Sequence, residues 1–291
     1  MKEIYFINRK RCIIAFVISV LIVVASYFAI AVLTILPATD TVTIVGLANF
    51  RYFTVLSNLF MNVCVVLSIP FQIDGLRYQN YHLPRWIVDL LYFGTVNMAI
   101  TFFGCTFVIA PINGFVVTFF SNTNFYLHIL CPILSLLLFL SINVDHKIKT
   151  NRIFLSTVPI LIYTIIYIVN VYLIGEDNGG WFDHYFIKDN FPLWQIICVT
   201  LVTTIIVASI LLFIHNLQHK KYKNKMINII KNNKSSNIIE DIKKLAHEQR
   251  KQYKEGNIIM PTHIIDAMQK EYGKDYINEE LYKVYLDNFL L

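Results

Sequence analysis

Long runs of apolar residues alternate along this chain with short polar stretches. A helix needs about 20 mostly apolar residues to cross the roughly 30 Å hydrocarbon layer of a membrane. Six runs reach this length, at residues 12–36, 52–73, 86–110, 124–144, 153–174 and 192–215. The pattern therefore predicts an all-α polytopic membrane protein, folded as a bundle of six transmembrane helices.

Two of the apolar stretches have alternatives to an ordinary membrane span. The run at 12–36 follows basic residues, as the core of a secretory signal peptide does, but its 25 residues exceed the about 7–15 of such a core. We therefore expect an uncleaved first span. A further stretch at 114–120 is too short to cross a membrane, and we expect it to lie at the interface.

The positions of Lys and Arg predict the orientation of the spans, because cytoplasmic loops carry an excess of these residues. Basic residues gather in segment 1–11, in loops 74–85 and 145–152, and after residue 216. The loops on the other side carry Arg51 and Lys188 only. We expect a multi-pass protein of the cell membrane with both termini cytoplasmic.

Charge also divides the chain into two parts. Charged residues make up 15% of the sequence, against about 25% in a soluble domain. Residues 217–291 hold 14 of the 25 Lys and Arg and 10 of the 19 Asp and Glu. We therefore expect a six-span membrane domain at 1–216 and a charged cytoplasmic tail at 217–291.

Helix signals in the tail predict short amphipathic helices. Asn237 followed by Glu240 has the form of a helix cap, and residues 264–272 and 279–290 carry helical patterns. Such helices suit contact with the anionic inner leaflet, at about 1 kcal/mol per basic residue near the surface. A partly disordered tail is the alternative, and the sequence favours neither.

The absence of several sequence motifs excludes the function classes that depend on them. The sequence contains no Walker motif, no dinucleotide loop, no HExxH and no GxSxG, and its five cysteines form no CxxC pair. The net charge of +6 is explained by the basic loops and the tail. We expect no metal, no cofactor and no nucleic-acid partner, and membrane lipids as the surroundings.

Two polar residues share a level near the external side of the predicted bundle. Spans two and four both begin externally, and a helix rises 1.5 Å per residue, so Thr54 lies about 3 Å and His128 about 6 Å below the surface. A hydroxyl becomes a nucleophile when a base such as imidazole takes its proton. Asn58, one turn below Thr54, and Ser57 are candidates to orient this pair or to stabilise an oxyanion.

The same residues also have structural readings, and these stay open. Thr in a span commonly hydrogen-bonds a carbonyl in the preceding turn, and a lone His can bridge two helices. Asn170 and Gln195 lie on the external side as further supporting candidates. The external loop adds Trp181, Asp183, His184 and Tyr185, whose simplest role is an aromatic belt at the interface.

Two short segments resemble a known family. Residues 50–58, Phe-Arg-Tyr-Phe-Thr-Val-Leu-Ser-Asn, resemble the F-T-x-x-S-N signature of bacterial six-span proteins, which are similar to the androgen-induced integral membrane hydrolases of animals. Residues 126–132, Tyr-Leu-His-Ile-Leu-Cys-Pro, place a His four residues before a Pro, as is typical there. A weaker match is 179–185, in the position of that family's aromatic loop. The resemblance covers residues 12 to about 215.

The resemblance implies a function. The animal proteins are threonine hydrolases that cleave fatty acid esters of hydroxy fatty acids. Carried over by motif, Thr54 is the nucleophile and His128 the base. The chain departs from the animal proteins in carrying Ser57-Asn58 and in its long tail, which puts the exact substrate in doubt.

Two functions are therefore expected. The first is a membrane-embedded lipid ester hydrolase that uses Thr54 and His128. The second is a non-catalytic protein that binds a lipid or a small molecule, or a transporter. Against transport, the sequence shows no internal repeat and no pair of broken helices.

Overall fold

The described part of the chain is helical throughout. The computed structural model describes residues 2–35, 46–78 and 83–232, apart from 143, 145, 186 and 189, together with 243, 244, 246–248 and 251. The amphipathic helices predicted at 264–272 and 279–290, and the cap at Asn237, lie outside the described residues.

Nine α-helices and five shorter turns follow one another along the described chain. The helices are α1 (Lys2–Ile35), α2 (Phe53–Tyr78), α3 (Arg85–Gly104), α4 (Ala110–Asn113), α5 (Phe115–Phe120), α6 (Cys131–Ser141), α7 (Arg152–Ser156), α8 (Val158–Ile168) and α9 (Leu193–Asn232). Two 3₁₀ turns, η1 (Gly46–Arg51) and η5 (Glu176–Asn178), and three π-helical turns, η2 (Cys105–Ile109), η3 (Phe125–Leu130) and η4 (Val169–Ile174), complete them.

Five helical segments in the described chain are long and apolar enough to cross a membrane. They are Lys10–Ile35, Phe53–Arg77, Arg85–Asn113, Arg152–Ile174 and Leu193–Tyr222. The sixth predicted span, at 124–144, is a shorter apolar helix, Phe125–Ser141. The last helix continues unbroken to Asn232, beyond the domain boundary expected at residue 216. These lengths are those of a multi-pass membrane protein.

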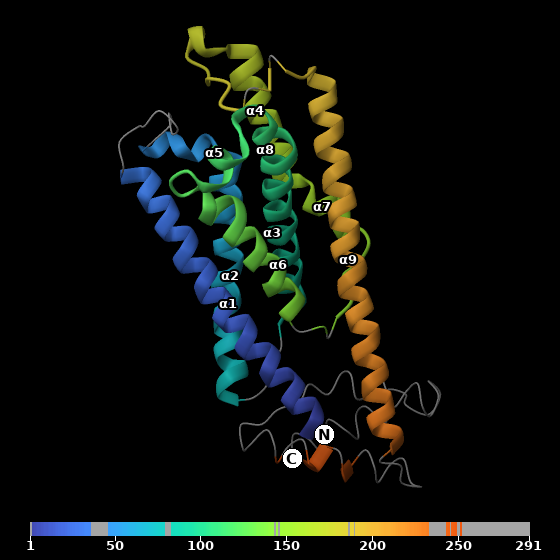
Figure 1. The fold of residues 1–291 in the computed structure, drawn as a ribbon. Coiled ribbons are helices and arrows are strands. Elements are labelled where there is room, and N and C mark those ends of the chain that lie inside the picture. The colour runs from blue at the N-terminus through green and yellow to red at the C-terminus, as the bar shows by residue number, and fades with distance from the viewer. Residues whose placement is uncertain are drawn as a thin grey trace.

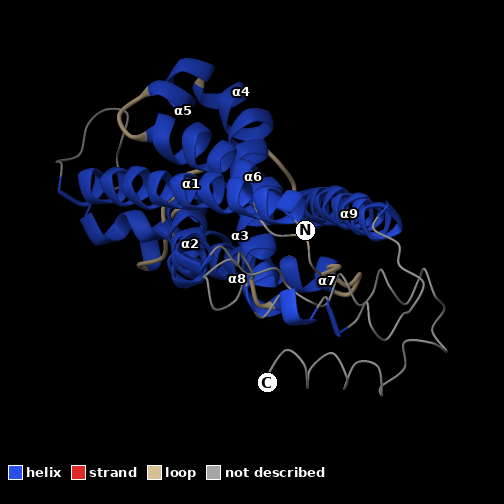
Figure 2. Ribbon diagram, turned by 90° about the horizontal axis from the view of Figure 1, so that it is seen from below, coloured by secondary structure: helices blue, strands red, loops and turns tan. Residues whose placement is uncertain are grey.

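The helices run alternately up and down the bundle, so α1 begins and α9 ends at the same end (Figure 1). We call this the basic end, because loop 142–151, which is rich in basic residues, lies there. The opposite end carries α4, α5 and loop 175–192, and we call it the aromatic end. Seen along the bundle, α9 lies at its side, close to α7 (Figure 2).

Polar side chains bind α1 to α2 along their shared length. Gln72 donates from Nε2 to Oγ of Ser19 at 3.0 Å, and Asn62 donates to the hydroxyl of Ser26. The thiol of Cys12 donates to the carbonyl of Gln72 at 3.1 Å. Between helices in an apolar surrounding, such hydrogen bonds supply specificity that apolar contacts alone do not.

Two of the π-helical turns have a clear cause in the sequence, because each ends just before a proline. Pro111 and Pro132 lack an N–H and would press on the carbonyl four residues earlier. The helix therefore shifts to the wider pattern, in which Ala110 donates to Cys105 and Cys131 donates to Tyr126, five residues back. Both turns lie toward the aromatic end.

At the basic end, α9 holds the loop that follows α6. Asn216 accepts from the N–H of Ile148 at 3.0 Å and donates to its carbonyl at 3.1 Å. His215 donates from Nε2 to His146 O at 2.9 Å, and His219 donates from Nδ1 to Val144 O at 2.5 Å. These bonds fix the position of the loop against α9.

Helices α2 and α3 approach most closely at Gly94. A Cβ atom at Gly94 would lie 2.7 Å from Sδ of Met61, which is fully buried, and 3.6 Å from its Cα. We expect Gly94→Ala to destabilise the chain by about 1–3 kcal/mol, as overpacking does. The measurement is the unfolding temperature of purified protein in detergent.

The matched control is Gly104→Ala on the same helix, where a Cβ atom meets nothing within 4 Å. Because Ala favours a helix over Gly by about 1 kcal/mol, Gly104→Ala should leave the unfolding temperature unchanged or raise it. Equal unfolding temperatures for the two variants would contradict the close packing at Gly94.

Candidate functional site

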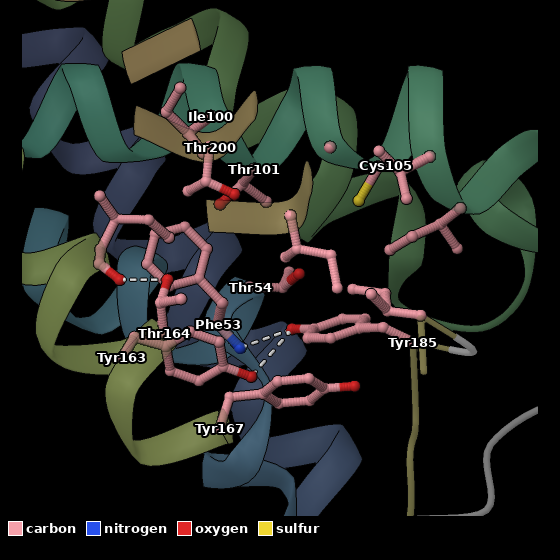
Figure 3. Close-up of a pocket in the computed structure, with 16 residues that line it drawn as sticks. Phe53, Thr54, Ile100, Thr101, Cys105, Tyr163, Thr164, Tyr167, Tyr185 and Thr200 are labelled. Atoms are coloured by element: carbon pink, nitrogen blue, oxygen red, sulfur yellow. Dashed lines mark hydrogen bonds between the residues drawn. The ribbon is translucent and has the colours of Figure 1, made fainter. Parts of the chain in front are cut away.

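Thr54 lines a small cavity near the aromatic end. The cavity has a volume of about 140 Å³ and lies between the first turn of α2, the end of α3 with η2, helix α8 and the start of α9. Most of its wall is apolar. Its polar groups come from Thr54, Thr101, Cys105, Tyr163, Thr164, Tyr167, Tyr185 and Thr200, all of which are labelled in Figure 3.

Thr54 is buried in the first turn of α2, and its side chain lies against a thiol. The hydroxyl of Thr54 and the thiol of Cys105 are within hydrogen-bonding reach. The sequence also allowed the hydroxyl of Thr54 to bond a carbonyl of the preceding turn. No such hydrogen bond is found among the described residues. The hydroxyl therefore faces the cavity and Cys105.

His128 lies in η3, half-buried, and its orientation is fixed by one strong contact. Nδ1 is 2.6 Å from the carbonyl oxygen of Thr118, and the ring stands edge-on to Phe119. Because a carbonyl only accepts, Nδ1 carries the hydrogen and Nε2 keeps its lone pair. This is the tautomer that a general base requires.

Asn58 joins the turn that carries Thr54 to the turn that carries His128. Its Nδ2 donates to the carbonyl of Thr54 at 2.8 Å and to the carbonyl of Leu127, next to His128, at 3.3 Å. Thr54 and His128 share no hydrogen bond in the described chain, so the contact between their turns runs through Asn58. Both amide hydrogens of Asn58 are engaged in this way.

Ser57 has a different neighbour. Its hydroxyl pairs with that of Thr101 on α3 at 2.7 Å and also donates to the carbonyl of Thr54 at 3.0 Å. Ser57 therefore ties α2 to α3 at the level of the cavity.

Tyr185, from the predicted external loop, closes the cavity above Thr54. Its hydroxyl accepts from the N–H of Phe53 at 2.7 Å, and so caps the exposed start of α2. The hydroxyl of Tyr163 donates to the carbonyl of Arg51 at 2.8 Å, directly before this turn. Two tyrosines from different elements therefore fix the backbone directly before Thr54.

Asp183 and His184 hold the rest of the loop in place. Asp183 accepts from the hydroxyl of Tyr167 with one oxygen and from the N–H of Lys188, at 2.7 Å, with the other. His184 is 7% exposed and lies among the rings of Tyr52, Tyr167 and Tyr185. Burial lowers the pKa of His184 to about 4, so its ring is neutral at pH 7.

The backbone of the loop depends on Gly180. A Cβ atom there would lie 2.2 Å from the carbonyl oxygen of Asn170 and 2.7 Å from that of Gly175. The Asn170 carbonyl accepts from the N–H groups of both Gly175 and Trp181, and its own amide donates to Ile166 O at 2.8 Å. Asn170 thus supports the loop, and its side chain lines neither described cavity.

A second, larger cavity adjoins the first. It has a volume of about 500 Å³ and lies between α2 and α8, with Trp181 at the aromatic end and Asn97 of α3 among its lining residues. Phe53 and Tyr163 line both cavities. The guanidinium of Arg51 lies 5.8 Å from the centre of the Trp181 ring.

The structure therefore gathers some of the sequence candidates and leaves others apart. Thr54 and Tyr185 line the small cavity, and Ser57 and Trp181 line the large one. His128, and Gln195 in the first turn of α9, line neither. Sequence reasoning missed Tyr163, Tyr167 and Cys105. The sequence did carry a signal for Tyr163 and Tyr167, because these two tyrosines, one turn apart, interrupt an otherwise aliphatic span.

Comparison with models of known protein families, with curated proteins and with solved structures finds no match. Within the described residues, no group of three or more His, Cys, Asp or Glu side chains is placed to hold a metal ion.

We expect His184 to make the loop sensitive to acid. The ring is neutral in the folded protein down to about pH 4, whereas in the unfolded chain it takes a proton near pH 6.5. The stability from this difference is complete above pH 6.5 and is lost as pH falls toward 4, by about 3 kcal/mol in all. Unfolding temperatures at pH 7 and pH 4 measure it.

His184→Gln is the control for this prediction, because Gln cannot take up a proton. The variant should lose less stability than the wild-type protein between pH 7 and pH 4. An equal loss in both proteins would show that other groups cause the acid sensitivity.

Proposed function

We propose that this chain is a membrane-embedded lipid ester hydrolase in which Thr54 is the nucleophile and His128 the base. One observation carries the proposal. Asn58 joins the turn of Thr54, which faces a cavity, to the turn of His128, whose Nε2 is left as an acceptor. The resemblance of residues 50–58 and 126–132 to the threonine hydrolases adds support.

The proposed reaction has two halves. In the first, the oxygen of Thr54 attacks the acyl carbon, and its proton passes through a bridging water to Nε2 of His128. The imidazolium returns the proton to the leaving alcohol, and an acyl-threonine remains. In the second half, His128 takes a proton from a water that attacks this ester. The imidazolium then gives that proton to the oxygen of Thr54 as the acid leaves, so both residues are restored.

Tyr185 is the proposed donor to the oxyanion. Its hydroxyl accepts from Phe53 N at 2.7 Å and lies 3.5 Å from the hydroxyl of Tyr163, which is the donor of that pair. No described hydrogen bond uses the hydrogen of Tyr185 itself. The hydroxyl of Tyr185 lines the same cavity as Thr54. Asn58 would have to give up a backbone partner to play this part, whereas Tyr185 would not.

We further propose that the helix Phe125–Ser141 crosses the membrane with the other five and that both termini are cytoplasmic. The basic residues of loops 74–85 and 145–152 support this orientation. The aromatic end, with both cavities, then faces outward. Phe125–Ser141 is about 26 Å long at 1.5 Å per residue, close to the thickness of the hydrocarbon layer.

A second candidate function is the binding of a lipid without chemistry. The large cavity favours this function, because about 500 Å³ of mostly apolar space suits a lipid chain. Thr54 is not among the residues that line it. Under this proposal Thr54 would pack against Cys105, and its loss would leave binding unchanged.

We expect purified protein to hydrolyse medium-chain esters and to react with a fluorophosphonate probe at Thr54. Thr54→Ala should lower kcat by about a thousandfold or more, because it removes the attacking oxygen. His128→Gln should lower kcat by about 100-fold or more, which is the usual contribution of a general base. Ester hydrolysis in detergent and probe labelling measure both effects.

Thr164→Ala is the matched control, since Thr164 lines the same cavity with its hydroxyl bonded to Ile160 O at 2.7 Å. It should keep most of the activity and all of the labelling. Labelling that survives Thr54→Ala unchanged would overturn the assignment of the nucleophile and favour the second candidate function.

The orientation has its own test. In a variant whose native cysteines are replaced, a single cysteine at Lys188 should react with a membrane-impermeant thiol reagent in intact cells. A single cysteine at Lys147 should react only after the cells are opened. The reverse pattern would overturn the proposed topology, because it results either from an inverted bundle or from a helix Phe125–Ser141 that does not cross. Reaction of both cysteines in intact cells would show that Arg152–Ile174, which lies between them, does not cross.

A further inference from the structure

The large cavity contains a buried polar group with an unfilled hydrogen-bonding position. Asn97 lies in the middle of α3, is 1% exposed and lines this cavity. Its Nδ2 donates to the carbonyl of Phe93 at 2.7 Å. Because a carbonyl only accepts, this bond fixes which side of the amide is nitrogen. Oδ1 of Asn97 is then an acceptor, and it has no partner among the described residues.

An unpaired acceptor in an apolar surrounding is costly, so a ligand that donates to it gains affinity. Ser57 lies nearby in the same cavity, and its single hydrogen is shared between Thr54 O and Thr101 Oγ1. Ser57 therefore has no hydrogen to spare for a ligand. Asn97 and Ser57 both offer acceptors to the cavity, so at this point of its wall a ligand with a hydroxyl is favoured and a carboxylate is disfavoured.

The rest of the cavity indicates a long apolar chain. Most of its other lining residues are aliphatic or aromatic, among them Leu56, Phe60, Val158, Ile162 and Ile166. Val158 and Ile166 are eight residues apart on α8, so the cavity extends about 12 Å along the helix. Ile162 is 54% exposed although it lines the cavity, so the cavity opens on the lipid-facing side of α8.

We propose that the cavity between α2 and α8 binds an uncharged single-chain lipid with one hydroxyl, of the class of long-chain primary alcohols. The hydroxyl donates to Oδ1 of Asn97, and the alkyl chain lies between α2 and α8. The lipid enters sideways past Ile162. This site stands apart from the hydrolase proposal, because Thr54 lines the neighbouring cavity.

The test uses the full chain in lipid nanodiscs with a diazirine analogue of hexadecan-1-ol. Light should attach the probe to peptides of α2 and α8 that line the cavity, as read by mass spectrometry. Unlabelled hexadecan-1-ol should compete about tenfold better than hexadecyl methyl ether, which has the same chain but no hydrogen to donate. Asn97→Leu should bring the two competitors to equal strength.

A pair of variants on α8 controls for folding. Ile162→Trp should fill the cavity and abolish the labelling, whereas Ile165→Trp should not, because Ile165 is 60% exposed and lines neither cavity. Thr54→Ala, which stops the proposed hydrolysis, should leave labelling intact. Equal competition by alcohol and ether in the wild-type protein, or labelling confined to residues that do not line this cavity, would overturn the proposal.

Discussion

The described structure depends on one constraint, which is that a polar group inside an apolar bundle has to find its partner within the protein. Helix α2 shows this most clearly. Its polar side chains reach three different neighbours: Gln72 and Asn62 bond to α1, Ser57 to α3 and Asn58 to the turn before α6. Apolar contacts would allow α2 to rotate or slide, whereas these bonds are made in one register only. The register of α2 then sets where Thr54 lies.

The same constraint explains the position of His128. Pro132 removes the hydrogen bond that a regular helix would make, and the chain passes through a π-helical turn before it. An extra residue in a turn rotates the following side chains by about 100° relative to a regular helix. The rotation and the bond to Thr118 together decide which way the imidazole faces. Pro111 has the same effect on η2, where Cys105 meets Thr54.

The hydrogen bonds between helices and the π-helical turns limit how much of the structure the sequence could predict. Apolar length alone is enough to locate the long helices, so four of the predicted spans agree with the structure within four residues at each end. The last one, Leu193–Tyr222, begins as predicted and ends seven residues later. The position of Thr54 in the first turn of α2 followed from the start of its apolar run. The direction of each side chain around its helix did not follow, because it depends on π-helical turns and on hydrogen bonds between distant segments. Tyr185, assigned to an aromatic belt, proved to cap α2 for this reason.

The two cavities share a wall, and the loop at the aromatic end contributes to both. Phe53 and Tyr163 separate them, while Trp181 lines the large cavity and Tyr185 the small one. The hydroxyls of Tyr163 and Tyr185 both bond to the backbone of residues 51–53. A lipid that displaces Phe53 or Tyr163 from one side must therefore act on the start of α2, where Thr54 lies. This shared wall is a physical reason to regard the two cavities as parts of one lipid-handling unit.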